Sequence, residues 1–554
     1  MPDTPIRSEA EIAVGGGDLL GAMDLFGFAG ALGSVLTRAG PSGAARRARS
    51  LLVELARIAA DRSDIVPAQR DWRFKNRAWQ DNPVFRRLAR SYLAWAEAVL
   101  GLVDDADLDW RTDERARFVL HNVTAACAPT NAFLLNPDAL ERAFETGGRS
   151  VLRGWRNVGR DVLHNHGLPR TVDRGAFELG RNLAATPGAV VFKSEVCELI
   201  QYTPTTDVVW ETPVVVVPPQ INKYYVMDLS PGRSFIAYAL ERGFQTYAVS
   251  WRNPTRDHGD WDLDTYVGAL HDAVTAAAEI CSSASANIVG VCAGGLTTAS
   301  LLGHLATLGD ELVRSATFAV TQIDYSVPSM IGMFSSPRIV RNSARMSALS
   351  GSLNGSSLEA MFAALRPNDL IWNYWVNNNL LGEDPSAFDV LAWNADSTAL
   401  PAALHQSFLR VYLQNGLALG EASVLGSPVD LGKVECDTLV VAGRTDHLVP
   451  WRACYANCGL FGGPTEFVLT SSGHIQSLVN PPGSARMTVT TGADTDGGAD
   501  EWLAEAKETP GVWWERWADW QACRAGQERP APRSLGSRAN PAGAPAPGDY
   551  VLNR

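Results

Sequence analysis

The chain has 554 residues, of which 46% are hydrophobic and 19% charged, so it is long enough for two or three compact domains and too apolar for extended disorder. Its formal net charge of −12 argues against binding to nucleic acid and against an electrostatic membrane anchor. Eight irregularly spaced cysteines do not resemble a disulfide framework, and we expect a cytoplasmic protein. We predict neither a secretory signal nor a membrane span, because no apolar run is long enough without a charge.

Residues 44–179 follow a helical pattern. Apolar side chains recur at i, i+3, i+4 and i+7, with arginines on the other face, in ARRARSLLVELARIAADR and NPVFRRLARSYLAWAEAVLGLV. Asn82 before Pro83 predicts the start of one helix, and we expect a further helix from Pro137 through the 140s. The sequence therefore predicts an all-helical N-terminal domain over residues 1–180.

Short β-rich runs alternate with helical stretches after Val190. The apolar runs are TPVVVVPP (212–219), FQTYAVSW (244–251), ANIVGV (286–291), ATFAVTQI (316–323), DTLVVAG (437–443) and EFVLTS (466–471). Uninterrupted apolar strands separated by helices predict a parallel sheet covered on both faces. We place this second domain at residues 181–525, with an inserted helical cap at about 325–425, where the gap between strands is too long for one crossover. The Pro/Ala/Gly-rich tail over 526–554 is expected to be extended, without a core of its own.

The third of these strands leads into Gly290-Val291-Cys292-Ala293-Gly294-Gly295, and a helix of small residues follows. This is the strand–turn–helix setting of a nucleophile elbow, with Cys292 in place of the usual serine. Glycines flank the nucleophile because side chains would clash in so sharp a turn, and the start of the helix offers N–H groups to a developing oxyanion. The alternative, a buried cysteine in a glycine-rich turn, explains the flanking strand and helix less well.

The order of the later polar residues provides an independent test of this interpretation. In an α/β-hydrolase fold, the nucleophile is followed along the chain by an acid and then by a histidine, each after a later strand. Asp446 follows the strand at 437–443, and His474 follows the strand at 466–471. Cys292, Asp446 and His474 therefore predict a catalytic triad on an α/β-hydrolase fold.

Other histidines and cysteines beyond the nucleophile are weaker candidates. His304 lies inside the elbow helix, His405 falls in the cap, and His447, next to the predicted acid, is expected to be a supporting residue. Cys454 and Cys458 are spaced i, i+4, which could clamp a metal ion. No histidine or second cysteine pair is arranged near them in the sequence, so we expect a helix face and no metal.

A cysteine nucleophile indicates what kind of substrate the enzyme uses. Its acyl-enzyme is a thioester, which keeps a high transfer potential and can pass its acyl group downhill to an alcohol. This fits acyl transfer from an acyl thioester such as acyl-CoA, although simple hydrolysis stays open. No glycine-rich nucleotide loop opens a helix after a strand, so we expect no cofactor, with CoA entering as part of the substrate.

Long segments of the chain resemble the poly(3-hydroxyalkanoate) synthases over nearly its whole length. They are WRFKNRAWQDNPVFRRLARSYLAW (72–95), PPQINKYYVMDLSPGRSF (218–235), SWRNPTRDHGDWDLDTY (250–266), GVCAGG (290–295), RPNDLIWNYWVNNNLLG (366–382), FDVLAWNADSTALPAALH (388–405), VAGRTDHLVPW (441–451) and GHIQSLVNPPG (473–483). The resemblance implies a polyester synthase that polymerises (R)-3-hydroxyacyl-CoA and releases CoA. The tail and GHIQS are most similar to the class II enzymes, which use medium-chain units, although Ala293 stands where that class tends to have serine.

The resemblance also implies roles for the site residues. Cys292 would be the nucleophile that accepts the acyl group, and His474 would be its general base. Asp446 would orient that histidine or help to activate the 3-hydroxyl of the incoming unit, and both roles stay open. The backbone N–H groups of Ala293 and Ile221 would form the oxyanion hole.

Two further motif residues are expected to have structural or interface roles, Asp228 as a turn or helix cap and Trp372 in packing of the cap. The resemblance suggests a homodimer that forms through the cap and attaches, with small coat proteins, to polyester granules in the cytoplasm. The aromatic run WWERWADW (513–520) could contact a membrane or granule, but packing on the sheet is the default expectation.

Two other functions compete with the synthase. A thioesterase or an intracellular polyester depolymerase would use the same triad, but the long helical N-terminal region and the cap motifs favour the synthase. A granule-coating scaffold with vestigial catalysis is the other alternative, and the intact Cys/Asp/His set argues against it.

Overall fold

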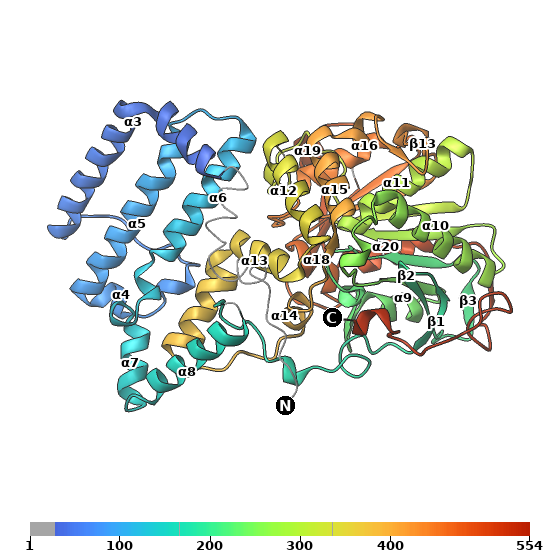
Figure 1. Ribbon diagram of the computed structural model, residues 1–554, viewed down its shortest axis with the longest axis horizontal. Coiled ribbons are helices and arrows are strands. Elements are labelled where there is room, and N and C mark those ends of the chain that lie inside the picture. The colour runs from blue at the N-terminus through green and yellow to red at the C-terminus, as the bar shows by residue number, and fades with distance from the viewer. Residues whose placement is uncertain (1–27, 166, 335, 493, 554) are drawn as a thin grey trace. The chain divides into compact units, whose positions relative to one another are not determined.

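The computed structural model describes residues 28–165, 167–334, 336–492 and 494–553. The chain forms two compact units (Figure 1). The first contains the residues up to Asp173 together with Glu359–Phe388, and the second contains Arg174–Leu358 and the chain from Asp389 onward. The first 27 residues, which belong to the predicted N-terminal domain, lie outside the described residues.

The first unit is built from helices. Its elements are α3 (Phe28–Ala59), η1 (Trp72–Phe74), α4 (Ala78–Asp81), α5 (Pro83–Asp104), α6 (Trp110–Ala126), η2 (Pro129–Asn131), η3 (Phe133–Leu135), α7 (Pro137–Glu145), α8 (Arg149–His164), η8 (Asn368–Trp372) and η9 (Trp375–Leu380). Val35, Val103 and Ala116 belong to one buried apolar cluster shared by α3, α5 and α6. The predicted start of α5 is confirmed, because the Asn82 side chain accepts a hydrogen bond from the Val84 N–H at 2.9 Å.

Two helices stand where the sequence predicts one helix from Pro137 through the 140s. Helix α7 ends at Glu145 and α8 begins at Arg149. Gly147 and Gly148 between them have φ values of 57° and 82°. Glycine adopts these left-handed conformations readily, and they interrupt the right-handed helix.

The segment Glu359–Phe388 is the main departure from the predicted domain boundaries. The sequence places it in the cap of the second domain, whereas the structure assigns it to the helical unit. Trp375 Nε1 donates to the carbonyl of Asn131 at 3.0 Å, and Asn157 Nδ2 donates to the carbonyl of Asn378 at 2.9 Å. These bonds satisfy polar groups inside the first unit and attach the segment to it.

The second unit contains a ten-stranded sheet. Its strands are β1 (Gly188–Lys193), β2 (Cys197–Tyr202), β4 (Val214–Val217), β7 (Thr246–Trp251), β8 (Ala286–Val291), β9 (Val313–Ala319), β14 (Asp437–Gly443), β15 (Thr465–Thr470), β16 (Thr488–Thr491) and β17 (Lys507–Pro510). Their order is β1-β2-β7-β4-β8-β9-β14-β15-β16-β17. The six central strands, β7, β4, β8, β9, β14 and β15, pair parallel with their neighbours in this series. The pairs β1–β2 and β2–β7 at one edge, and β15–β16 and β16–β17 at the other, are antiparallel. The six predicted strands form the parallel core of this sheet, as expected, whereas β1, β2, β16 and β17 pair antiparallel at its edges and were not predicted.

Helices connect and cover these strands. They are α9 (Phe235–Glu241), α10 (Leu263–Ile280), α11 (Ala293–Leu308), α17 (Trp451–Ala456), α18 (His474–Val479), α19 (Ala499–Glu505) and α20 (Trp513–Ala522). The part of the predicted cap that stays with the sheet contains α12 (Pro337–Ser350), α14 (Asp389–Asn394), α15 (Ala402–Gln414) and α16 (Gly416–Leu419). Alternating strands and helices around a parallel core are typical of the α/β-hydrolase fold that the sequence predicts.

The aromatic run at 513–520 packs inside the second unit. Trp513, Trp514 and Trp517 on α20 are almost completely buried, and all three contact the ring of Phe235 on α9. The expectation of packing within the fold is therefore confirmed over that of a membrane or granule contact. No helix in the described ranges is long and apolar enough to cross a membrane.

The C-terminal tail is extended and lies along the sheet. Strand β18 (Glu528–Pro530) pairs antiparallel with β3 (Val208–Trp210), and Val190 on β1 exchanges backbone hydrogen bonds with residues 543 and 544. The buried carboxylate of Glu198 accepts hydrogen bonds from the backbone of Asp549 and Tyr550, both at 2.9 Å. The tail thus covers part of an edge of the sheet that would otherwise be exposed.

Candidate active site

Cys292 occupies a strained turn between β8 and α11. Its φ and ψ angles are 52° and −121°, a backbone conformation that residues other than glycine rarely adopt. The Cys292 N–H donates to the carbonyl of Ala319 at 3.0 Å, and Thr321 Oγ1 donates to the Cys292 carbonyl at 3.1 Å. These bonds to the end of β9 hold the strained residue, and the Cys292 side chain remains partly exposed.

The glycines after Cys292 allow close packing around the turn. A Cβ atom on Gly294 would lie 2.2 Å from the carbonyl oxygen of Val217, at the end of β4. A Cβ atom on Gly295 would lie 2.2 Å from Thr321 Oγ1. Because these distances are shorter than non-bonded atoms tolerate, the glycine pattern of the elbow follows directly from its packing.

Replacing Gly294 by alanine is expected to lower both stability and activity. The added methyl group meets backbone atoms that cannot rotate away, so the cost should be about 1–3 kcal/mol. The measurement is the thermal midpoint of the purified variant beside its rate of CoA release. Gly459→Ala is the matched control in the same unit, because nothing lies within 4 Å of its added Cβ. Equal midpoints for the two variants would contradict the packing argument.

Asp446 and His474 meet beyond the ends of β14 and β15. Asp446 Oδ2 and His474 Nδ1 are 2.6 Å apart, and both residues are 6% exposed. The other carboxylate oxygen, Oδ1, accepts hydrogen bonds from the backbone N–H groups of Leu448 and Val449 at 2.9 and 3.0 Å. The backbone therefore fixes the carboxylate, and the carboxylate in turn fixes the orientation of the imidazole ring.

The charges around His474 favour its protonated form. Burial lowers the pKa of His474, but the negative charges of Asp446 and Cys292, with hydrogen bonds to both, outweigh burial and raise the pKa to about 10. Since Nδ1 faces Asp446, Nε2 is the nitrogen left to face the sulfur of Cys292. The structure thus brings together the three side chains that the sequence singles out.

The loop after β4 lies beside the start of α11, as an oxyanion hole requires. The Cβ position of Gly294 is 2.6 Å from the carbonyl oxygen of Pro218 in this loop. Further along the loop, the Ile221 carbonyl accepts a hydrogen bond from the Thr398 N–H at 3.4 Å. Ala293 is the first residue of α11. That the N–H groups of Ala293 and Ile221 act on an oxyanion stays a prediction.

The predicted supporting residues occupy three different places. Asp228 is buried, burial raises its pKa, and it accepts hydrogen bonds from the hydroxyls of Thr186 at 2.5 Å and Ser234 at 2.7 Å. Ser234 caps α9, so Asp228 supports a helix cap and a turn. His447 lies in the turn that carries Asp446. Trp372 belongs to η8 in the helical unit, so it does not pack in the cap of the second unit as predicted.

Among the weaker candidates, His304 and the cysteine pair are buried within the second unit, and His405 is half-buried there. His304 is 9% exposed on α11. His405 Nδ1 lies 3.0 Å from Ser347 Oγ, and burial lowers its pKa to about 4. Cys454 and Cys458 are both buried, and burial raises the pKa of each thiol.

Two tyrosines near Cys292 were not found by sequence reasoning. The rings of Tyr325 and Tyr412 lie 4.6 Å apart. Burial raises the pKa of both phenols, and the charge of Cys292 adds to this increase, so both lie close to the nucleophile. Asn415 Oδ1 accepts a hydrogen bond from the Tyr325 N–H at 2.8 Å and holds that tyrosine in place.

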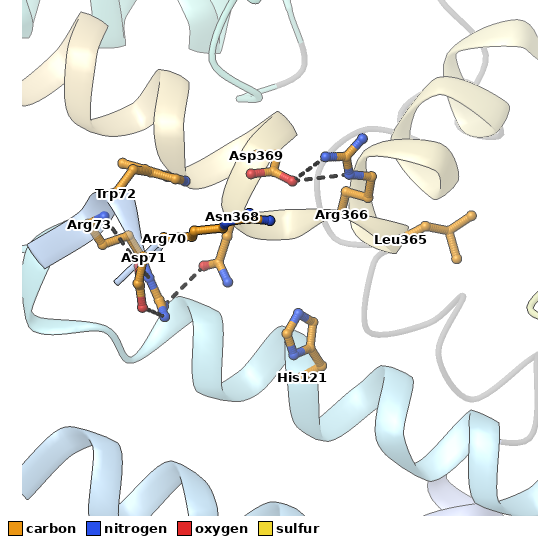
Figure 2. Close-up of a pocket in the computed structure, with 9 residues that line it drawn as sticks. All are labelled: Arg70, Asp71, Trp72, Arg73, His121, Leu365, Arg366, Asn368 and Asp369. Atoms are coloured by element: carbon orange, nitrogen blue, oxygen red, sulfur yellow. Dashed lines mark hydrogen bonds and ion pairs between the residues drawn. The ribbon is translucent and has the colours of Figure 1, made fainter. Parts of the chain in front are cut away.

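A polar cavity of about 290 Å³ lies in the helical unit, whereas Cys292, Asp446 and His474 belong to the second unit (Figure 2). Its lining includes two ion pairs, Arg73 with Asp71 at 2.7 Å and Arg366 with Asp369 at 2.6 Å. The lining residues include no thiol or hydroxyl nucleophile. We therefore do not assign catalysis to this cavity.

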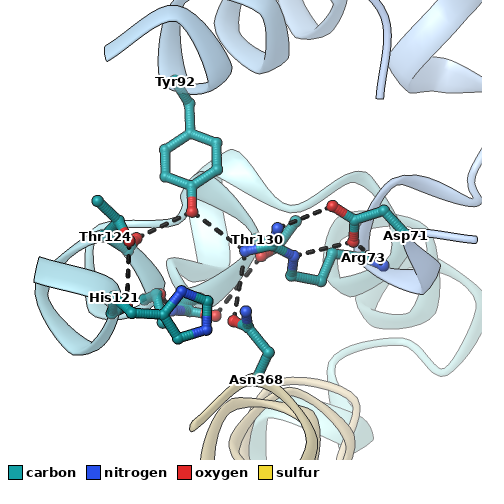
Figure 3. Close-up of polar contacts among 9 residues, drawn as sticks. Asp71, Arg73, Tyr92, His121, Thr124, Thr130 and Asn368 are labelled. Atoms are coloured by element: carbon teal, nitrogen blue, oxygen red, sulfur yellow. Dashed lines mark hydrogen bonds and ion pairs between the residues drawn. The ribbon is translucent and has the colours of Figure 1, made fainter. Parts of the chain in front are cut away.

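The Arg73 side chain organises one wall of that cavity (Figure 3). Its guanidinium donates to Tyr92 Oη at 3.1 Å and to Asn368 Oδ1 at 3.3 Å, in addition to Asp71. Tyr92 Oη donates in turn to the carbonyl of Thr124 at 2.9 Å. This network joins the segment after residue 359 to the N-terminal helices, which is a structural role.

Comparison with known proteins decides the family. Residues 70–239 match the family described as poly-beta-hydroxybutyrate polymerase (PhaC) N-terminus, and residues 213–481 match the alpha/beta hydrolase fold. Poly(3-hydroxyalkanoate) polymerase 1 of Ectopseudomonas oleovorans is 44% identical over 503 residues, which cover 91% of this chain and 90% of the relative. The chain belongs to the poly(3-hydroxyalkanoate) polymerase family.

Other members of the poly(3-hydroxyalkanoate) polymerase family are also similar to this chain over most of its length. Poly(3-hydroxyalkanoate) polymerase 2 of the same organism is 45% identical over 90% of both chains. The poly(3-hydroxyalkanoate) polymerase subunit PhaC of Cupriavidus necator is 38% identical over 89% of this chain and 85% of its own. The predicted synthase family, its α/β-hydrolase fold and its acyltransferase class are therefore confirmed, and the thioesterase and depolymerase alternatives are not supported.

Proposed function

We propose that the protein polymerises (R)-3-hydroxyacyl-CoA into a poly(3-hydroxyalkanoate) and releases CoA, with the acyl chain carried as a thioester on Cys292. The observation that supports this proposal is the buried His474, which bonds Asp446 through one nitrogen and faces Cys292 with the other. This arrangement is the one that activates a thiol nucleophile.

In the first step, His474 Nε2 takes the proton of the Cys292 thiol. The carboxylate of Asp446 accepts a hydrogen bond from Nδ1–H and stabilises the imidazolium that forms. The thiolate attacks the thioester carbonyl of the substrate, and the N–H groups of Ala293 and Ile221 bind the oxyanion. Collapse of the tetrahedral intermediate breaks the bond to the CoA sulfur, and the imidazolium gives its proton to the departing thiolate.

In the second step, the acyl group moves from sulfur to oxygen. The 3-hydroxyl of another unit or of a chain end loses its proton to His474, with Asp446 either orienting that base or assisting directly. The resulting alkoxide attacks the acyl thioester on Cys292 and forms an oxoester, while the thiolate leaves and regenerates the nucleophile. Repeating the two steps lengthens the polyester.

Water must be kept from the acyl thioester, because hydrolysis would compete at every cycle. Tyr325 and Tyr412, which come from the loop after β9 and from α15, place apolar rings close to Cys292. We assign them to the wall that excludes water.

Family membership further supports a homodimer in the cytoplasm, at the surface of polyester granules and beside coat proteins.

The test is CoA release from (R)-3-hydroxybutyryl-CoA and (R)-3-hydroxyoctanoyl-CoA, with the product sized by chromatography. We expect CoA release together with a high-mass, insoluble polyester, and the ratio of rates ranks the two chain lengths. The reaction should need no added cofactor or metal ion. CoA release that yields only free hydroxy acid would contradict the proposal and indicate a thioesterase.

A further inference from the structure

Helix α8 carries three different stripes of side chains. Residues that follow one another at intervals of four, three and four lie on one line along a helix. The first stripe is small and polar, and consists of Ser150, Gly154, Asn157 and Asp161. The second is apolar, and consists of Val151, Trp155, Val158 and Val162. The third is cationic, and consists of Arg149, Arg153, Arg156 and Arg160.

The polar stripe, and not the apolar one, faces the protein. All four of its residues are buried. A Cβ atom on Gly154 would lie 2.1 Å from the carbonyl oxygen of Asn379, so the helix packs against the backbone of η9. Asn157 donates to the carbonyls of Asn378 at 2.9 Å and Glu383 at 3.3 Å. These contacts fix the rotation of α8 about its own axis.

Because the polar stripe points inward, large apolar side chains point outward. Trp155 is 71% exposed, and Leu152 and Leu163, which flank the apolar stripe, are 73% and 76% exposed. A helix that packs only against its own domain normally buries such residues. Three exposed apolar side chains of this size on one helix therefore indicate a surface that is covered when the protein works.

The arginine stripe lies alongside this apolar surface. Arg149, Arg153 and Arg156 are exposed and form no ion pair within the described part of the chain. The only acidic residue of α8, Asp161, lies in the buried stripe, 3.5 Å from Arg170. The net charge of −12 argues against an electrostatic membrane anchor for the chain as a whole, but the exposed edge of α8 is locally cationic.

We propose that the outer face of α8 adsorbs to an anionic phospholipid surface, with Leu152, Trp155 and Leu163 in the acyl region and the exposed arginines on the headgroups. Exposed tryptophan and leucine beside a row of arginines are the composition of helices that lie in a lipid–water interface. The proposal does not depend on the polymerase reaction. It also requires no membrane span, because the helix lies on the lipid surface.

The positive charge of α8 favours an anionic lipid surface over a polyester surface and over a second copy of the same helix. A poly(3-hydroxyalkanoate) surface is uncharged along the chain and offers no negative charge to the three exposed arginines. A second copy of α8 would place two arginine rows side by side, and these would repel each other. Anionic headgroups match both the apolar and the cationic stripe.

The test is co-sedimentation of the full-length protein with vesicles of phosphatidylcholine alone and of phosphatidylcholine with phosphatidylglycerol in equal amounts. We expect strong binding only to the mixed vesicles, weakened by high salt. Arg153→Glu with Arg156→Glu should reduce the partition coefficient by about tenfold or more, since each basic residue near an anionic surface contributes about a factor of five. Leu152→Ser with Trp155→Ser should reduce it to a similar extent.

Matched controls use exposed residues elsewhere in the helical unit. Leu36→Ser with Leu52→Ser removes two leucines that are 65% and 67% exposed on α3. Arg49→Glu with Arg62→Glu makes the same charge change away from α8. Both controls should bind as the wild type does, and all variants should keep its thermal midpoint, because the altered side chains are exposed.

Three results would overturn the proposal. The first is equal binding of the α8 variants and the controls to mixed vesicles. The second is binding of the wild type to lipid-free polyester particles with no binding to either kind of vesicle. The third is loss of self-association in the α8 variants without any vesicle binding by the wild type, which would make the face a protein interface.

Discussion

Cys292→Ala is expected to reduce CoA release from a 3-hydroxyacyl-CoA by at least about 10³-fold and to abolish polymer formation. The thioester intermediate can form only on the sulfur at the end of β8, and alanine offers no nucleophile there. The fold should be kept, because the strained turn is held through the Cys292 backbone, whose N–H donates to the Ala319 carbonyl and whose carbonyl accepts from the Thr321 hydroxyl, and alanine retains both bonds. The measurement is release of free CoA, with the thermal midpoint recorded beside it.

Cys523→Ala is the matched control for this variant. Cys523 is exposed and lies in the same unit, so its removal should leave CoA release unchanged. Cys292→Ser tests the chemistry further, since it keeps the shape but replaces the thiol by a much weaker acid. We expect an activity far below that of the wild type. Normal polymer synthesis by Cys292→Ala would refute the role of Cys292 and revive the scaffold alternative.

Asp446→Asn is expected to lower the rate of CoA release by about 10²–10⁴-fold. An asparagine can still accept the N–H groups of Leu448 and Val449, so the turn survives. Its amide, however, donates to His474 Nδ1 instead of accepting from it. This selects the tautomer with the proton on Nε2, and a histidine in that form cannot take the proton of the Cys292 thiol.

The same substitution should shift the titration of His474 downward. In the wild type, the charges of Asp446 and Cys292 raise the pKa of His474 to about 10, so the ring is protonated below that pH and neutral above it. Removing the carboxylate removes one of these charges, and the pKa should fall toward its ordinary value. Nuclear magnetic resonance of histidine-labelled protein measures this directly, with His474→Gln identifying the signal.

A raised pKa in the folded state also has a consequence for stability. It stabilises the fold fully below the ordinary histidine pKa of 6.5, and the stabilisation is lost as the pH rises through about 10. The thermal midpoint of Asp446→Asn should therefore lie furthest below that of the wild type near pH 6.5 and approach it near pH 10. A difference that grows with pH, or an unchanged His474 titration, would contradict the electrostatic argument.

Much of the site could be predicted because its residues are tied to local patterns. Glycine is required at positions 294 and 295 because an added Cβ atom at either one would lie 2.2 Å from a neighbouring atom, so the elbow shows as a motif of consecutive residues. Asp446 and His474 follow strands whose apolar runs are unmistakable, and parallel strands bring their ends to one edge of the sheet. These local patterns predict Cys292, Asp446 and His474 in the chain order of the nucleophile, the acid and the histidine.

Other features could not be predicted because they depend on contacts between distant segments. Tyr325 and Tyr412 become neighbours only through folding of the loop after β9 and α15, and no motif joins them. The assignment of Glu359–Phe388 to the helical unit rests on side-chain amides and an indole that bond backbone carbonyls, which any sequence could supply. The antiparallel edge strands β16 and β17 are short and polar, so they lack the apolar signature of the central strands.

Acylation of Cys292 can be measured directly by peptide mass spectrometry of the wild-type protein, quenched in acid shortly after (R)-3-hydroxyacyl-CoA is added. We expect a 3-hydroxyacyl group, or an oligomer of it, on the peptide that contains Cys292, and we expect its loss when the thioester is cleaved with hydroxylamine. Acylation of a different residue, or turnover with no acyl group on any cysteine peptide, would contradict this expectation.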